Sequence, residues 1–184
     1  HIMQRLNVSE ECAITLKQKL CEYLWLHNEI QFLGQVHGKL IQGVFDQSLF
    51  DLCAQNRKFK CTSEYYSLLQ LEYHKGIRAR DNQVKLYEHV TGNKPQAIIE
   101  QRPGSGKTTM LPALASALIA REKHIIIEIP PELYSVQSQE LSHELLKFGH
   151  KPYHLKKIDS LSADSLTDLH QELIECKETN RPIL

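Results

Sequence analysis

A glycine-rich segment followed by a lysine and two threonines constrains the fold of this chain more than any other feature. Residues 101–109 read Gln-Arg-Pro-Gly-Ser-Gly-Lys-Thr-Thr. The core Gly-x-Gly-Lys-Thr is typical of a loop that wraps backbone N–H groups around a polyphosphate and then opens a helix, whose positive end faces the anion. The segment therefore predicts a strand, a phosphate-binding loop and a helix, in that order.

Each part of this loop has an expected role in binding ATP and Mg²⁺. Glycines let the backbone approach the phosphates closely and adopt φ values that a side chain would resist. We expect the Lys107 ammonium to lie at the β- and γ-phosphates and the Thr108 hydroxyl to bind Mg²⁺. Lys107 and Thr108 are the predicted catalytic residues, and the predicted nucleotide-binding residues of the loop are Gly104, Ser105, Gly106, Lys107, Thr108 and Thr109.

The sequence on both sides of the loop supports this interpretation. Residues 97–100 are a short, mostly apolar run suited to a buried strand, and residues 110–120 are rich in alanine and leucine, as a buried helix would be. Pro112 removes one helix hydrogen bond, so we expect it to kink or tighten the first turns. The full pattern has glycine where this chain has Gln101, and a glycine-rich turn that binds no ligand is the alternative.

Residues 104–112, Gly-Ser-Gly-Lys-Thr-Thr-Met-Leu-Pro, resemble the first motif of superfamily 2 helicases, especially the DEAH-like branch. Residues 130–137, Pro-Pro-Glu-Leu-Tyr-Ser-Val-Gln, are similar to the family segment Pro-Thr-Arg-Glu-Leu-Ala-x-Gln, although the family's arginine has no basic counterpart here. In the family that segment touches the nucleic-acid backbone. A looser similarity to proteins with a SecA-type ATPase core points the same way. The resemblance implies a P-loop (Walker A) ATPase lobe of a helicase or translocase, whose substrate would be a nucleic acid or a protein.

Residues 77–83, Ile-Arg-Ala-Arg-Asp-Asn-Gln, resemble the Arg-x-x-Gln element that precedes the first motif in many of these ATPases. In the family this glutamine reads the edge of adenine, because a side-chain amide can donate and accept hydrogen bonds at once. The resemblance implies that Gln83 is a nucleotide-binding residue. An exposed glutamine on a helix is the alternative explanation.

Helices and strands are expected to alternate from residue 77 onwards. The pattern predicts helices at 82–91, 107–121, 132–148 and 163–179, and strands at 96–100, 124–129 and 152–157. Such alternation predicts an α/β fold, here the parallel sheet of a partial P-loop NTPase (RecA-like), with ligand at the carboxyl ends of the strands.

The first part of the chain has a different texture. Residues 8–75 show helical periodicity without a glycine-rich linker. We therefore predict an N-terminal α-helical region at 1–76, with residues 1–3 as a cloning remnant, and an incomplete P-loop NTPase lobe at 77–184.

A helicase motor also needs an Asp-Glu motif and a second lobe with an arginine finger. No predicted strand ends in Asp-Glu. We therefore expect a fragment that requires the remaining ATPase lobe of a longer parent chain and hydrolyses ATP poorly by itself. Two alternatives stay open. The run 125–128, Ile-Ile-Ile-Glu, would make Glu128 the acidic residue of a small P-loop kinase, or the loop is vestigial and the helical region is a non-catalytic interaction module.

The composition bears on the partners, the cellular compartment and the metal sites that the chain can have. Lys+Arg and Asp+Glu both number 22, so the overall charge does not indicate a nucleic-acid-binding surface. The five cysteines form no Cys-x-x-Cys pair, which favours a reducing, intracellular and cytoplasmic location. No run approaches the ~20 apolar residues of a membrane span. His150 and His154 stand four apart, but Pro152 between them disfavours a helical zinc site.

Overall fold

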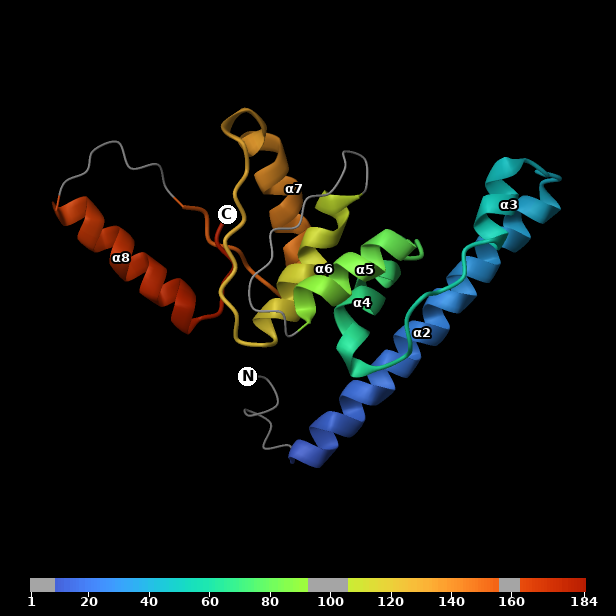
Figure 1. Ribbon diagram of the computed structural model, residues 1–184, viewed down its shortest axis with the longest axis horizontal. Coiled ribbons are helices and arrows are strands. Elements are labelled where there is room, and N and C mark those ends of the chain that lie inside the picture. The colour runs from blue at the N-terminus through green and yellow to red at the C-terminus, as the bar shows by residue number, and fades with distance from the viewer. Residues whose placement is uncertain (1–8, 93–105, 156–162) are drawn as a thin grey trace. The chain divides into compact units, whose positions relative to one another are not determined.

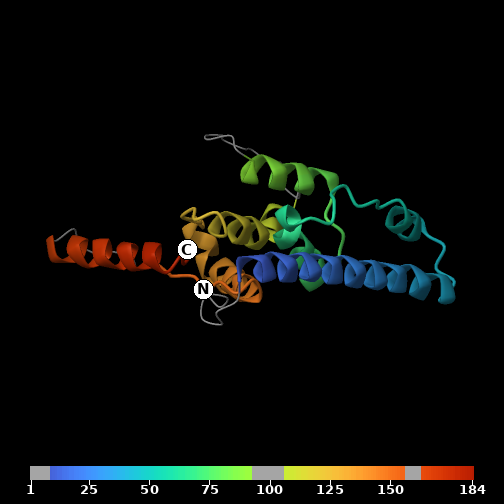
Figure 2. The same ribbon diagram turned by 90° about the horizontal axis from the view of Figure 1, so that it is seen from below.

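The computed structural model describes residues 9–92, 106–155 and 163–184 (Figures 1 and 2). The chain divides into two compact units, His1–His89 and Val90–Leu184, and each is described by itself. The predicted boundary after residue 76 falls within the first unit and stays a prediction.

A long helix, α2 (Glu10–Ile41), organises the first unit. Ser9 begins it, because the Ser9 side chain accepts a hydrogen bond from the backbone N–H of Cys12. Glu10 and Glu11 lie in the first turn, where carboxylates are favoured by the positive end of the helix. The helices α3 (Gln47–Cys53) and α4 (Tyr66–Lys75) and the short 3₁₀ helix η1 (Ser63–Tyr65) all pack against α2.

The helix α5 (Asp81–Thr91) follows α4 after a short turn. Gly76 follows α4 with φ of 62°, a left-handed conformation that glycine adopts readily at the end of a helix. The core of this unit combines apolar side chains from α2, α3, α4, α5 and the loop before η1. Its buried members include Cys21, Leu24, Leu49, Phe59, Leu68, Leu69, Leu71, Val84 and Tyr87.

In the second unit, α6 (Lys107–Ile119) packs against α7 (Tyr134–Lys147), which follows the 3₁₀ helix η2 (Pro131–Leu133). A further helix, α8 (Ala163–Glu178), comes after residues 156–162, which the structure does not describe. The core is formed by Ala115, Leu141, Leu145 and Leu184, with partly buried Leu111, Ile125, Ile127 and Ile129 against it. The helix α6 continues through the buried Pro112, although this residue donates no backbone hydrogen bond.

The predicted α/β fold with the parallel sheet of a P-loop NTPase is wrong. The described ranges are about 70% helical and contain no strand or sheet, so the fold is all-helical. Residues 124–129 and the described part of 152–157, both expected as strands, make only isolated parallel bridges with Ile183, at Ile126 and Tyr153. The expected strand at 96–100 lies outside the described residues.

Proline gives a physical reason for this difference. Pro130, Pro152 and Pro182 stand in or beside the three extended segments, and each lacks the backbone N–H that a strand ladder needs. Five backbone hydrogen bonds still join the described parts of these segments, such as the one from the Ile127 N–H to the Ile183 carbonyl at 2.8 Å. By contrast, the helices expected at 82–91, 107–121, 132–148 and 163–179 are present as α5, α6, η2 with α7, and α8.

Candidate functional site

The first turn of α6 contains the described end of the glycine-rich loop. Gly106 precedes the helix with φ of 80°, a left-handed conformation in which glycine is not strained. The Gly106 carbonyl accepts the first helical hydrogen bond, from the Met110 N–H at 3.2 Å. Lys107, Thr108 and Thr109 therefore lie together in one helical turn, whereas Gln101, Gly104 and Ser105 lie outside the described residues.

This turn has the electrostatic character of an anion site. The leading N–H groups of an α-helix point out of its N-terminus and carry partial positive charge. No described side chain caps α6, and its first turn contains no acidic residue. Lys107 and Thr108 are both exposed, so an ammonium and a hydroxyl lie at the same helix end. These groups together fit a phosphate chain.

The residues of this turn also fit Mg²⁺ when it is bound through a nucleotide. Mg²⁺ prefers oxygen ligands and is often held by one or two protein groups together with substrate phosphates. The Thr108 hydroxyl is such an oxygen. Among the described residues, no group of three or more His, Cys, Asp or Glu side chains could hold a metal ion without that help. Glu128, the acidic residue of the kinase alternative, is exposed in the extended segment before η2.

Gln83 helps to begin α5. Its Oε1 accepts a hydrogen bond from the backbone N–H of Arg80 at 2.9 Å, and the Arg80 carbonyl accepts from the N–H groups of Gln83 and Val84. This is one half of a capping box, in which the third helical residue reaches back to the residue before the helix. Gln83 is buried and lies in the first unit, while Lys107 lies in the second. Its role in adenine binding stays a prediction.

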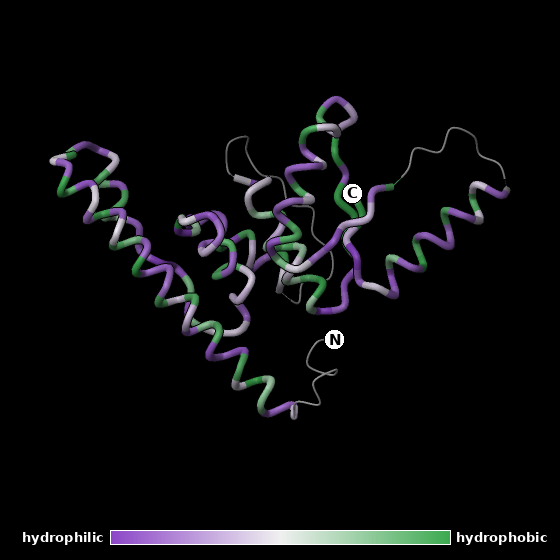
Figure 3. The backbone as a smooth tube through the Cα atoms, turned by 180° about the vertical axis from the view of Figure 1, so that it is seen from behind, coloured by the Kyte–Doolittle hydropathy of each residue, from purple (hydrophilic) through white to green (hydrophobic). Residues whose placement is uncertain are grey.

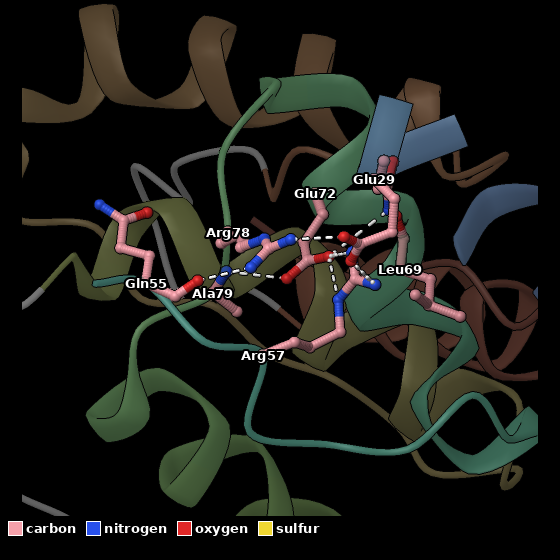
Figure 4. A network of polar contacts seen from close by, with 8 residues as sticks. Glu29, Gln55, Arg57, Leu69, Glu72, Arg78 and Ala79 are labelled. Atoms are coloured by element: carbon pink, nitrogen blue, oxygen red, sulfur yellow. Dashed lines mark hydrogen bonds and ion pairs between the residues drawn. The ribbon is translucent and has the colours of Figure 1, made fainter. Parts of the chain in front are cut away.

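The sequence interpretation missed a buried ionic cluster in the first unit (Figure 4). Arg57 lies between two carboxylates, with Nη2 2.6 Å from Glu72 Oε2 and Nη1 2.7 Å from Glu29 Oε1. Arg78 joins the same cluster through Nη2, 2.6 Å from Glu29 Oε2. The second Glu72 oxygen accepts from the Ala79 N–H at 2.9 Å. Burial raises the pKa of Glu72 and outweighs the opposite effects of that hydrogen bond and of the two arginines.

A serine and a histidine also contact each other in the second unit. His154 Nε2 lies 3.0 Å from Ser142 Oγ, and Nδ1 lies 3.2 Å from the Tyr134 hydroxyl. Ser142 has one proton, which it donates to the Ser138 carbonyl at 2.6 Å. These contacts connect His154 to Tyr134 and Ser142 of α7. They fasten the segment before residue 156 to that helix.

Buried thiols offer no activated nucleophile. All five cysteines are free. Burial raises the pKa of the Cys21, Cys61 and Cys176 thiols, which keeps them in the weakly nucleophilic protonated form.

Comparisons with known proteins add no family to this picture. No protein-family model, curated protein or solved structure matches the chain. None of the helices in the described ranges combines the length and the apolar character that crossing a membrane requires.

Proposed function

We propose that the first turn of α6 binds the phosphates of Mg·ATP, and that the chain is the ATP-binding portion of a helicase- or translocase-like ATPase. One observation carries the proposal: α6 begins at Lys107, directly after the left-handed Gly106 and without a side-chain cap from the residues that the structure describes. Such a helix start presents backbone N–H groups, an ammonium and a hydroxyl to a single anion. This chemistry requires the helix end and does not depend on a neighbouring sheet.

Each residue of this turn would contact a different part of the phosphate chain. Lys107 would neutralise charge on the β- and γ-phosphates, Thr108 would complete the Mg²⁺ ligands and Thr109 would reach the α-phosphate. The parent protein would couple hydrolysis to movement of a nucleic acid or a protein, and its other lobe would supply the arginine finger, which contributes about 10³–10⁵ in rate. The five free cysteines favour a cytoplasmic location for this activity.

Calorimetry with Mg·ATP and the 184-residue chain tests the proposal. We expect saturable binding that weakens by at least about tenfold in Lys107→Ala, since a charged contact to phosphate is lost. Lys123→Ala is the matched control, because Lys123 is exposed just after the opposite end of α6. Phosphate release should stay near background in the unmodified chain. A folded sample that does not bind millimolar Mg·ATP, or an equal effect of the two lysine variants, would show the proposal to be wrong.

The exposed face of α2 favours a second candidate function, a non-catalytic interaction module. Large apolar side chains stand at three- and four-residue steps along this helix, and apolar positions recur along its length in Figure 3. The exposed members of this stripe are Leu16, Leu20, Tyr23, Leu26, Ile30 and Leu33, and Leu40 stands seven residues further along. Their spacing is typical of a helix that pairs with another helix, and isolated chains rarely expose so long an apolar surface.

For this second candidate we propose that α2 pairs with α2 of another copy of the chain. Sedimentation analysis should then show a dimer, and Ile30→Lys should shift it to monomer because a charge would be buried at the centre of the interface. Gln18→Lys, an exposed position outside the stripe, should leave the dimer intact. A monomeric unmodified chain would rule out this pairing.

A further inference from the structure

The apolar stripe of α2 repeats every seven residues, and its members fall into two rows. The first row is Leu16, Tyr23 and Ile30, and the second row is Leu26, Leu33 and Leu40. The two rows alternate at steps of three and four residues, so they occupy the a and d positions of a heptad repeat. All six side chains are 44–69% exposed. The stripe therefore has the pattern of one helix of a coiled coil.

The residue types in the two rows favour a parallel pair of helices. A β-branched residue at a with leucine at d is typical of parallel, two-stranded coiled coils. Ile30 stands at a between Leu26 and Leu33 at d, and Leu40 continues the d row. In a parallel pair each row faces the same row of the partner helix, so two copies of this chain supply matching surfaces.

Lys19 also belongs to the d row, because it stands seven residues before Leu26. Its ammonium lies 2.8 Å from Glu22 Oε2 on the same helix. A lysine can keep its apolar stem along such a row while its charge is held at the edge. A single polar residue in the row costs some stability but helps to specify the register of the two helices.

The area of the stripe is sufficient for a stable pair. Its members and Leu40 are 40–69% exposed and leave about 700 Å² for a partner, close to the ~800 Å² that each side of a stable interface buries. A second copy of α2 therefore accounts for the whole stripe.

Cys12 extends the d row towards the N-terminus, fourteen residues before Leu26. Its thiol is free and exposed. In a parallel pair that is in register, a residue at d faces its own counterpart, so the two copies of Cys12 would face each other. With helix axes about 10 Å apart and Cα atoms about 2.3 Å from each axis, facing Cα atoms lie about 5–6 Å apart, which is the separation that a disulfide spans.

We propose that α2 pairs in parallel and in register with α2 of a second copy, and that a peroxide oxidises the two Cys12 side chains to a disulfide that locks the pair. One Cys12 sulfur attacks a peroxide oxygen, the O–O bond breaks, and a sulfenic acid and one water form. The second Cys12 sulfur then displaces the hydroxyl as water and closes the S–S bond. Two thiols and one hydrogen peroxide thus give one disulfide and two waters. This inference rests on the self-pairing of α2 proposed above and is independent of ATP binding at α6.

Non-reducing electrophoresis of the full chain after treatment with hydrogen peroxide tests this arrangement. We expect a cross-linked dimer that dithiothreitol returns to monomer. Cys12→Ser should abolish the cross-link. Cys53→Ser is the matched control and should leave it unchanged, because Cys53 is also exposed but lies on α3. In sedimentation, the oxidised chain should stay dimeric at dilutions that dissociate the reduced chain.

Ile30→Lys separates pairing from chance collision of thiols. It keeps Cys12 but disrupts the proposed interface, so both the reduced dimer and the cross-link should be lost. A reduced, unmodified chain that is monomeric would show the self-pairing to be wrong, and this inference with it. A dimer that forms no cross-link through Cys12 would overturn the parallel register alone. A cross-link that survives in Cys12→Ser or in Ile30→Lys, or that Cys53→Ser abolishes equally, would overturn it as well.

Discussion

Arg57 and Glu72 form a buried ion pair, with Nη2 2.6 Å from Oε2 and side chains that are only 4% and 1% exposed. The Arg57 guanidinium also lies 4.0 Å from the centroid of the Trp25 ring. Removing both charges from water is costly, and burial accordingly raises the pKa of Glu72 despite its partners. The pair therefore fixes how α4 and the segment before η1 fit together, while the cost of burying both charges offsets part of their attraction.

Removing one partner should nevertheless be severe. We expect Arg57→Met to lower the free energy of unfolding by about 3–5 kcal/mol, because it leaves a buried carboxylate without its main counter-charge. The double variant Arg57→Met with Glu72→Gln should regain a substantial part of this loss. Urea denaturation near neutral pH measures both values. Losses that simply add in the double variant would contradict the coupling.

His150 makes the stability of the second unit depend on pH. Its Nε2 is buried and has no hydrogen-bond partner among the described residues, and burial lowers the pKa of His150 below its usual 6.5. The unfolded chain therefore binds a proton at His150 more readily than the folded chain does. The contribution of His150 to the free energy of unfolding is fully present above pH 6.5, and it is lost as the pH falls from there towards the pKa of the folded state.

The contribution of one such group is at most about 1.4 kcal/mol per pH unit. Unfolding free energies measured between about pH 7 and about pH 5 should therefore fall less steeply in His150→Leu than in the unmodified chain. His143→Leu is the control, because His143 is exposed on α7. Identical slopes for His150→Leu and the unmodified chain would refute this role.

Gln83 allows its capping and its adenine-binding roles to be separated. Gln83→Ala removes the acceptor for the Arg80 N–H and should destabilise the chain by about 1 kcal/mol. Gln83→Glu keeps that acceptor and should lose less stability, but it has no amide donor for adenine. If Gln83 also reads adenine, both variants should reduce the preference for ATP over GTP in calorimetry. Unchanged nucleotide preference would leave capping as its function.

Helices were predictable from this sequence because their signals are local. Residues 82–91 were expected as a helix and α5 spans Asp81–Thr91, since periodicity and capping act within a few residues. The sheet was not predictable in the same way. Apolar runs such as 124–129 suit a strand, but pairing depends on distant segments, and prolines in those segments restrict the hydrogen bonds they can form.

The same distinction applies to the sites. Lys107 and Thr109 share a turn because they are neighbours in the chain, so the motif alone predicted their arrangement. The ionic cluster joins Glu29, Arg57 and Glu72, which no sequence spacing connects. The one local sign of the cluster in the sequence is Glu72, a carboxylate that directly follows the fully buried Leu71 within a helix.

Alanine substitutions at Gly106 and Gly149 separate the effect of backbone strain from the effect on nucleotide binding. Gly106 and Gly149 have φ of 80° and 82°, so alanine at either position should cost about 1–2 kcal/mol of stability. An alanine Cβ at Gly149 would meet no atom within 4 Å, which makes Gly149→Ala a control for strain alone. Gly106→Ala also disturbs the point where α6 begins, and we expect it alone to weaken Mg·ATP binding by about tenfold or more, because the phosphates approach the backbone there. Calorimetry on both variants, with urea denaturation of each, measures the two effects. Equal Mg·ATP affinity in two equally destabilised variants would show that the start of α6 does not hold the phosphates.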